Sequence, residues 1–357
     1  MKRPEQPSVL MKRPRGRAGE ATPEPAALES APPPPPLVVR LLQQLLFVPW
    51  AGVLVGLAAI CIYLAIASPQ FLTSYNLSQV SVNFSWICIT GFGEALVIIG
   101  GGLDLSVGST MGFAGMVAAM ALTANWPVAL AVGAGMLSGL VIGLINGLVI
   151  TRIGLNPFIT TLGMLSVVRG LTYGIVGGGA VTVPDGPAGA AFSNLGVGAA
   201  GTVPYPVIVL VVLGILATIG LNQTRWGRYI YAVGGNESAT RMLGINVRRM
   251  KVWMYVICAV IASIGGILLT AKSGTALPDA AVGYELNVIA AVIIGGTSLS
   301  GGRGTVAGVL VGAALLGVIN NGLVLIGLAG YWQQTVIGLV IILAATLDVI
   351  RERLRRS

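Results

Sequence analysis

Residues 222–251 read NQTRWGRYIYAVGGNESATRMLGINVRRMK, a basic, glycine-containing stretch that lies between two strongly apolar runs. The run before it is PYPVIVLVVLGILATIGL (residues 204–221), and the run after it is VWMYVICAVIASIGGILLTA (residues 252–271). Each run approaches the roughly 20 apolar residues that a helix needs to cross a lipid bilayer. This part of the sequence therefore predicts two membrane-spanning helices joined by a folded, water-exposed segment.

The composition of the whole chain is typical of a membrane protein. Of 357 residues, 55% are hydrophobic and 9% are charged, whereas soluble domains carry about 25% charged residues. The 51 glycines suit close helix packing and broken helices in a membrane. The chain has no histidine, so the commonest metal ligand and general base is missing. The cysteines Cys61, Cys88 and Cys258 lie singly in apolar runs, and we expect neither a disulfide nor a metal site.

The apolar runs predict an all-α polytopic membrane protein with about ten transmembrane helices. The third and eighth runs are short and rich in glycine, so we expect broken or re-entrant helices there. The predicted spans are residues 41–67, 79–100, 107–124, 127–150, 158–177, 204–221, 252–271, 285–298, 305–327 and 332–350.

Cationic residues favour one side of this topology. The connections on the side of residues 222–251 also carry Arg152 and Arg303, whereas the other side carries only Lys272 among cations. Because cytoplasmic loops of membrane proteins are enriched in Lys and Arg, we expect both termini in the cytoplasm. The predicted organisation is a disordered, proline-rich cytoplasmic tail (residues 1–36), a transmembrane domain (residues 37–350) and a basic cytoplasmic tail (residues 351–357).

A short internal similarity suggests an inverted repeat. The string GLINGLVI (residues 143–150) resembles GVINNGLVL (residues 317–325). The strings end the fourth and ninth predicted spans, and an offset of five helices would relate two halves by inverted symmetry, as in many transporters.

The chain lacks the residues of an ATP site. A P-loop needs a lysine after its glycines to reach the phosphates, and the nearest string, GLDLSVGST (residues 102–110), has none. Without histidine the usual catalytic triads and zinc sites are also excluded. We therefore expect neither an enzyme nor a cofactor bound by this chain.

Polar residues inside the apolar runs are candidates for a translocation pathway, because intramembrane acids and amides are costly and face a cavity or a partner. Asp104 and Ser106 either break a helix on that pathway or cap the next helix. Glu94 lies deeper, and Arg169 is its predicted counter-charge in a structural ion pair, with direct contact to the substrate as the alternative. Amides and aromatic rings would suit a polyhydroxyl substrate, or the amides would join helices. The candidates are Asn83, Glu94, Asp104, Ser106, Asn146, Phe158, Arg169, Tyr173, Asn287, Asn320 and Gln333, with Asn321, Trp332 and Gln334 of the same chemistry nearby.

Residues 222–251 have the signals of a short helix. Asn236 can cap a helix over Glu237–Leu243, and Gly244 can end it in the left-handed conformation. Gly234 and Gly235 are predicted to supply a hinge before it. The cations of the stretch alone would be explained by topology and anionic lipid, but a capped helix in the longest cytoplasmic connection would not.

The sequence resembles the permease subunits of bacterial ABC sugar importers, of the ribose, xylose and galactose type within the branched-chain amino acid and sugar permease superfamily. The similar strings cover most of residues 76–350 in order. They are GGLDLSVGS, NPFITTLGMLSVVRGL, GRYIYAVGGNESATRMLGI, VGYELNVIAAVIIGGTSLSGGRGT and WQQTVIGLVIIL.

This resemblance implies that residues 222–251 contain the helix that couples the permease to its ATPase. It also implies that residues 295–305 lie near the translocation path or its cytoplasmic mouth. The expected partners are an ABC ATPase that holds ATP and Mg²⁺, a periplasmic-type sugar-binding protein and a second permease copy, in a bacterial inner membrane; nucleic acid is not expected. The coupling role falls on Gly234, Gly235, Asn236, Glu237, Ala239, Arg241 and Gly244.

The expected function is transport of a monosaccharide or related polyol, driven by ATP on a separate subunit. An alternative is a secondary transporter driven by an ion gradient, for which Glu94 is the candidate ion site. A membrane-embedded enzyme is disfavoured by the missing histidine and the few acids.

Overall fold

The computed structural model describes residues 50–328, together with isolated positions further on. Those positions are Trp332, Thr335, Val336, Gly338, Leu339, Ile342 and Thr346. The predicted tails, the start of the first predicted span and most of the last span lie outside the described residues.

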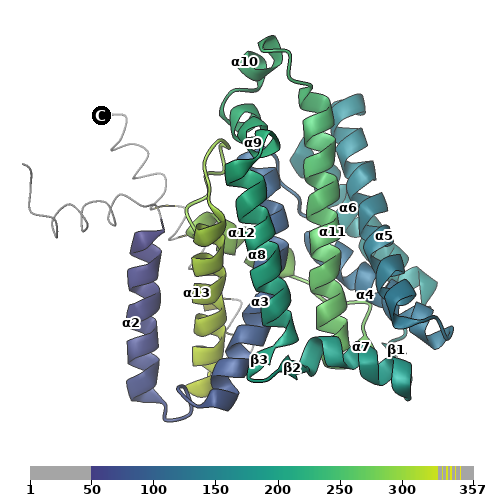
Figure 1. Ribbon diagram of the computed structural model, residues 1–357, viewed down its shortest axis with the longest axis vertical. Coiled ribbons are helices and arrows are strands. Elements are labelled where there is room, and N and C mark those ends of the chain that lie inside the picture. Colours follow the sequence, from purple (N-terminus) through teal and green to yellow (C-terminus); the bar gives the residue numbers. More distant parts are fainter. Residues whose placement is uncertain are drawn as a thin grey trace, which may run out of the picture. The chain divides into compact units, whose positions relative to one another are not determined.

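The described chain is mostly helical, as predicted for an all-α membrane protein (Figure 1). Its helices are α2 (Ala51–Ala67), α3 (Ser74–Ile99), α4 (Val107–Thr123), α5 (Val128–Leu148) with the π-helical turn η1 (Val149–Ile153), α6 (Pro157–Ile175), α7 (Pro187–Val197), α8 (Tyr205–Gln223), α9 (Arg225–Gly235), α10 (Glu237–Met242), α11 (Val247–Ser273), α12 (Tyr284–Ile294) and α13 (Val306–Leu325). Two short antiparallel ribbons join β1 (Val181–Thr182) to β4 (Thr275–Ala276) and β2 (Ala199–Ala200) to β3 (Val203–Pro204).

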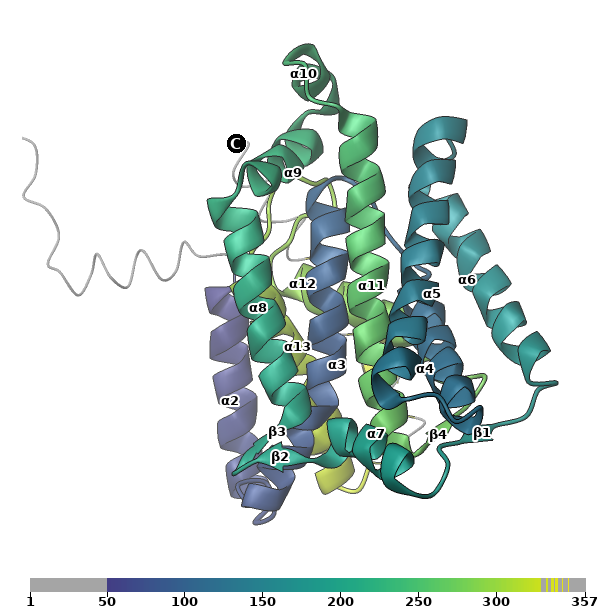
Figure 2. The ribbon, with the colours of Figure 1, turned by 45° about the vertical axis from the view of Figure 1, so that its right-hand side comes forward.

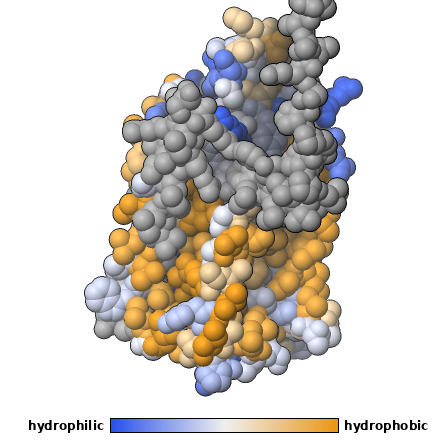
Figure 3. All heavy atoms as spheres, turned by 90° about the vertical axis from the view of Figure 1, so that its left-hand side faces the viewer, coloured by the Kyte–Doolittle hydropathy of each residue, from blue (hydrophilic) through white to orange (hydrophobic). Residues whose placement is uncertain are grey.

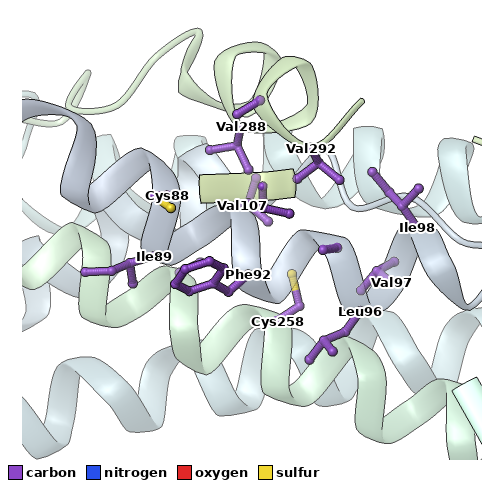
Figure 4. Packing of buried hydrophobic residues seen from close by; sticks show 14 of the residues in the cluster. Cys88, Ile89, Phe92, Leu96, Val97, Ile98, Val107, Cys258, Val288 and Val292 are labelled. Carbon is purple, nitrogen blue, oxygen red and sulfur yellow. The ribbon is translucent and has the colours of Figure 1, made fainter. Parts of the chain in front are cut away.

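Helix α3 is the centre of the bundle. It packs against α8, α11, α12 and α13, and 89% of its most apolar window is buried inside the protein. Figure 4 shows Phe92 and Leu96 of α3 close to Cys258 of α11, with Val288 and Val292 of α12 on the other side. Helix α3 is therefore shielded from lipid by its neighbours, whereas the helices around it meet the bilayer.

The outer helices carry their apolar residues outward. In the most apolar windows of α6 and α8, 22% and 17% are buried, and large side chains such as Ile159 and Ile215 are exposed. Figure 3 shows hydrophobic residues in a belt around the visible face, with hydrophilic residues gathered at the end of α9 and α10. An apolar belt of this kind is the surface that lipid tails solvate, and the chain is an integral membrane protein.

Small residues let α5 approach α11 closely. A Cβ added at Gly143 would lie 2.8 Å from the Val256 Cα, and one at Gly147 would lie 2.8 Å from the Val252 Cα. Small residues four positions apart face the same side of a helix, and they are a common device for packing helices without a hydrophobic driving force.

The count of ten spans is not confirmed. In the part of the chain that the structure describes, six helices are long and apolar enough to cross a membrane, and α2, α4 and α12 are shorter apolar helices. The third and eighth predicted spans are indeed short, because α4 has 17 residues and α12 has 11. At 1.5 Å per residue α12 extends roughly 16 Å, about half of the hydrocarbon core. The proposed inverted repeat stays a prediction.

The end of the bundle opposite α10 holds an element that the sequence did not predict. Between α6 and α8 the chain forms the short helix α7, which packs against α11 (Figure 2). Pro187 occupies the first turn of α7, after Gly186 with φ of 109°. We call this end of the molecule the α7 end and the opposite end the α10 end.

Candidate coupling helix and buried polar cluster

Helix α10 forms where the sequence predicted it. The Asn236 side chain accepts a hydrogen bond from the Ala239 N–H at 2.9 Å, and Gly244 after the helix has φ of +80°. Figures 1 and 2 show α10 beyond the ends of the long helices that flank it. The predicted cap and stop signals are therefore confirmed. They delimit a helix of about one and a half turns that lies outside the bundle.

Ion pairs tie α10 to α11. Glu237 accepts from Arg241 at 2.8 Å, four residues on, and from Lys251 of α11 at 2.6 Å. The hydrogen bond from Lys251 lowers the pKa of Glu237, against a smaller opposing effect of burial. Glu237 is therefore charged at neutral pH, and its contact with Lys251 fixes α10 on the start of α11.

The tip of α10 presents apolar side chains to water. Met242 is 85% exposed and Leu243 is 78% exposed, beside a surface hollow lined by Glu237, Ser238 and Arg241. Unlike the exposed side chains of α6 and α8, these do not belong to the apolar belt. Two adjacent apolar side chains are therefore exposed at the polar end of the bundle.

Gly234 is a close-packing position, and the hinge expected at Gly234 and Gly235 stays a prediction. Gly234 and Gly235 are the last residues of the regular helix α9. A Cβ at Gly234 would overlap the Ile99 carbonyl oxygen and lie 2.7 Å from the Gly302 N. The Gly302 N–H in turn donates to the Ile99 oxygen at 2.8 Å.

This backbone contact joins α9 to the end of α3 and to the loop before α13. Tyr231 adds a side-chain bond, because its hydroxyl donates to the Gly304 oxygen at 2.8 Å. These contacts tie α9 to the end of α3 and to residues 295–305. That loop was expected near the pathway or its cytoplasmic mouth, and it lies at the base of the predicted coupling helix.

Glu94, Asp104, Ser106 and Asn146 come together in a fully buried polar cluster. The Asp104 N–H donates to Glu94 Oε1 at 3.0 Å, and Asp104 Oδ1 accepts from the N–H and the hydroxyl of Ser106. Asn146 Nδ2 of α5 donates to the Ser106 oxygen at 2.9 Å. The Ser106 hydroxyl turns back to Asp104 and does not cap α4, so the predicted cap by Ser106 is wrong and the turn is held by Asp104.

The cluster holds acids without a cation. Among the described residues the ion pairs are those of Glu237, and Asp104 Oδ2 and Asn146 Oδ1 have no hydrogen-bond partner there. A buried carboxylate without a counter-charge costs several kcal/mol. The hydrogen bonds within the cluster offset part of that cost.

One face of α11 connects the cluster to α10. Lys251 contacts Glu237, Tyr255 donates to the Leu103 oxygen at 3.3 Å, and Cys258 lies 3.6 Å from Glu94 Oε2. These positions are four and three residues apart, which places them on one helix face. A cavity of about 10 Å³ lies between Lys251, Gly102 and Tyr255, room for about one water molecule.

The predicted ion pair between Glu94 and Arg169 is wrong. The Arg169 guanidinium donates to the Pro278 and Ala280 oxygens at 2.9 and 2.7 Å. Arg169 reaches them past Gly112 of α4, where a Cβ would lie 3.1 Å from the guanidinium. It thus fixes the segment before α12, and backbone carbonyls satisfy it where a carboxylate was expected.

The other candidates are dispersed. Phe158 and Tyr173 are exposed on α6, whereas Asn287 and Asn320 are half-buried on α12 and α13. Gln333 and Gln334 lie outside the described residues. Asn321 forms a reciprocal amide pair with Asn76 of α3, at 2.8 and 3.1 Å. The role of amides as links between helices is confirmed at this position.

The arrangement agrees with a family match over most of the chain. Residues 76–345 match the family described as the branched-chain amino acid transport system / permease component. The chain belongs to this family. No solved structure matches it.

Sugar import permeases are among its relatives. The chain is 40% identical over 295 residues to the ribose import permease protein RbsC of Escherichia coli strain K12, covering 83% of this chain and 92% of that protein. It is 36% identical over 292 residues to the D-allose transport system permease protein AlsC of the same strain, covering 81% and 88%. It is 36% identical over 319 residues to the galactose/methyl galactoside import permease protein MglC, also of that strain, covering 84% and 94%.

Sequence reasoning missed the partners of Asn83. Lys272 of α11 donates to Asn83 at 2.6 Å and to Gln79 at 3.3 Å. The spacing of Gln79 and Asn83 along α3 is that of neighbours on one helix face, which was the available signal. The residues described in the structure contain no group of His, Cys, Asp and Glu that could hold a metal ion.

Proposed function

We propose that the chain is the membrane-spanning subunit of an ABC importer for a monosaccharide or a related polyol. Membership of a permease family and similarity to permeases named for ribose, allose and galactose support this function. The observation that carries it is α10, a capped helix beyond the membrane helices with Met242 and Leu243 exposed at its tip. A chain without a P-loop needs such a contact to receive energy from another protein.

In this proposal ATP and Mg²⁺ are bound by a separate ATPase, and this chain binds no cofactor. Closure of the ATPase would push α10, and the pathway would change the side to which it opens. The contacts at Gly234 and along α11 would carry the movement inward. The coupling role rests on Gly234, Gly235, Asn236, Glu237, Ala239, Arg241 and Gly244.

The remaining parts of the importer follow from the same proposal. The α10 end faces the cytoplasm of a bacterium, the α7 end faces outward from the inner membrane, and both termini are cytoplasmic. A periplasmic-type binding protein delivers the sugar, and a second permease copy completes the pathway. Residues 1–36 and 351–357 are tails on a transmembrane domain over residues 37–350.

A second candidate is an ion-driven secondary transporter, favoured by the buried cluster of Glu94 and Asp104 without a cation. Intramembrane acids of this kind form proton relays in pumps and transporters. This alternative assigns no task to the exposed tip of α10, and a direct measurement of the energy source separates the two candidates.

Co-purification with the ATPase tests the proposal through α10. We expect the double substitution Met242→Ser and Leu243→Ser to reduce recovery of the ATPase at least tenfold, because an apolar anchor at an interface centre contributes about 2 kcal/mol or more. Val197→Ser, an exposed apolar residue at the α7 end, is the control and should leave recovery unchanged. Glu237→Lys and Arg241→Glu should also weaken the association while the chain still enters the membrane. Normal recovery in all these variants would refute the coupling role of α10.

A further inference from the structure

We propose that Lys272, Gln79, Asn83 and Trp86 form a contact site for the hydroxyl groups of a neutral sugar at the α7 end of the bundle. This inference rests on the proposed function and names where the substrate first touches the permease. The site is separate from the buried cluster of Glu94 and from α10.

Lys272 is held as a cation without an acidic partner. Its ammonium donates to Asn83 Oδ1 at 2.6 Å and to Gln79 Oε1 at 3.3 Å, and it lies 5.0 Å from the centroid of the Trp86 ring. Within residues 50–328 no carboxylate oxygen lies within 4.0 Å of it. Neutral amide oxygens and an aromatic face therefore stabilise its charge.

The fold fixes these groups in place. Gln79, Asn83 and Trp86 recur at intervals of four and three on one face of α3. Lys272 lies in the last turn of α11, where the helix dipole favours a cation. Gly196 of α7 packs so closely on the Lys272 backbone that a Cβ there would overlap it. The ammonium is thus positioned by α3, α7 and α11 together.

Unused hydrogen-bonding capacity points to a ligand with many hydroxyl groups. An ammonium has three N–H donors. Within the described residues the Lys272 ammonium donates to Gln79 and Asn83 alone, which leaves one donor for a ligand. The amide nitrogens of these residues have no acceptor among the described residues, and Asn83 is exposed. A sugar hydroxyl can accept from the ammonium and from both amides, while the buried Trp86 ring stabilises the ammonium.

The same geometry argues against an anionic ligand. The Gln79 and Asn83 oxygens already accept from the ammonium and offset part of its attraction for a carboxylate or a phosphate. A hydroxyl oxygen carries a partial charge and also donates a proton, so it meets the amide oxygens favourably. The chemical class that fits is a neutral polyhydroxyl compound, as sugars are.

Uptake into vesicles with the assembled importer tests the site. The wild-type permease, its ATPase and its binding protein are reconstituted, and ATP-dependent uptake of D-ribose, D-allose and D-galactose is measured. Lys272→Met keeps the apolar stem over Trp86 and removes the ammonium. We expect the apparent KM for the transported sugar to rise about tenfold, since a hydrogen bond to a charged group is lost. Asn83→Leu should raise it about threefold, because one neutral bond is lost.

Asp185→Asn removes a charge from an exposed residue of the connection before α7 and is the matched control, with no change expected. ATPase recovery and basal ATP hydrolysis should be normal in the variants of the site, since α10 is distant from it. Unchanged KM values in Lys272→Met and Asn83→Leu would overturn the site while the importer function stands. Absence of ATP-dependent uptake by the wild type would overturn both proposals.

A thiol introduced at position 83 keeps the test decisive if Lys272→Met disturbs assembly. Asn83→Cys, made together with Cys61→Ser because Cys61 is half-buried, should react with a membrane-impermeant thiol reagent, whereas the native Cys88 and Cys258 are buried. In the complete importer, saturating transported sugar should slow this reaction at least threefold. Equal reaction rates with and without sugar would overturn the proposed contact.

Discussion

At the scale of single residues, the state of Glu94 decides how the buried cluster is held. The side chain is fully buried, accepts the Asp104 N–H and forms no ion pair with any residue of the described part of the chain. Glu94→Gln keeps the acceptor oxygen and the volume and removes the cost of a buried carboxylate without a counter-charge. We expect it to unfold at the same temperature as the wild type or higher in detergent. Glu94→Ala should lose about 2–4 kcal/mol, because it leaves a cavity and an unpaired N–H. Equal destabilisation by both changes would show that Glu94 acts as a charge.

Gly234 offers a residue-scale test of the contact between α9, α3 and the loop before α13. Gly234→Ala should destabilise the protein by about 1–3 kcal/mol, because the added methyl group overlaps the Ile99 oxygen and rigid backbone cannot yield cheaply. Gly220→Ala in α8 is the matched control, since no described atom lies within 4 Å of its Cβ position. The unfolding temperature and the rate of ATP-dependent uptake should both fall in Gly234→Ala. Neither should change in the control. If alanine were tolerated at both positions, the proposed contact between α9, α3 and the loop before α13 would be contradicted.

Individual contacts were less predictable from the sequence than the residues that make them. Glu94 and Arg169 were paired because charges are few, but a half-buried arginine can equally be satisfied by carbonyl oxygens, as Arg169 is by those of Pro278 and Ala280. Composition gives no register between helices that are far apart in the chain. Asn146 and Ser106 were named as polar candidates, and their meeting with Asp104 required the three-dimensional packing.

At the scale of elements, α10 is stabilised by a charge that acid removes. The hydrogen bond from Lys251 lowers the pKa of Glu237 from the ordinary value of 4.5. A carboxylate with a lowered pKa contributes stability that is complete above 4.5 and is lost as the pH falls through the folded pKa. The ¹³C shift of the Met242 methyl group should therefore be constant at neutral pH and change below about 4.5.

Glu237→Gln is the control for this titration. It removes the titrating group, so the acid change of the Met242 signal should vanish while Asn236 still caps the helix. A change that persists in Glu237→Gln would assign the titration to another group.

Elements with local signals were predictable, and elements fixed by tertiary contacts were not. The sequence predicts both the cap of α10 at Asn236 and its end at the left-handed Gly244. Helix α7 lies in a stretch of small residues with weak apolar periodicity, and its place is fixed by packing against α11. Helix α9 was predicted as part of a polar loop. Its apolar residues Ile230 and Val233 are buried by residues distant in the sequence, and this packing was not predictable from the sequence alone.

At the scale of the whole molecule, the sequence led to the correct class, an integral membrane protein of helices with a short polar excursion. The exact number of spans did not follow, because runs such as those of α4 and α12 are apolar yet shorter than the bilayer core. Hydropathy records apolar length, and it does not separate a helix that crosses the membrane from one that stops inside the protein.

The central claim is that energy enters this protein from a separate ATPase through α10. Sugar uptake into vesicles containing the permease, its ATPase and its binding protein measures this directly, with and without internal ATP and with an ionophore that removes ion gradients. We expect uptake that requires ATP, is insensitive to the ionophore and is lost in the Met242→Ser, Leu243→Ser variant. Uptake that persists without ATP and collapses with the ionophore would contradict the claim and favour the ion-driven alternative.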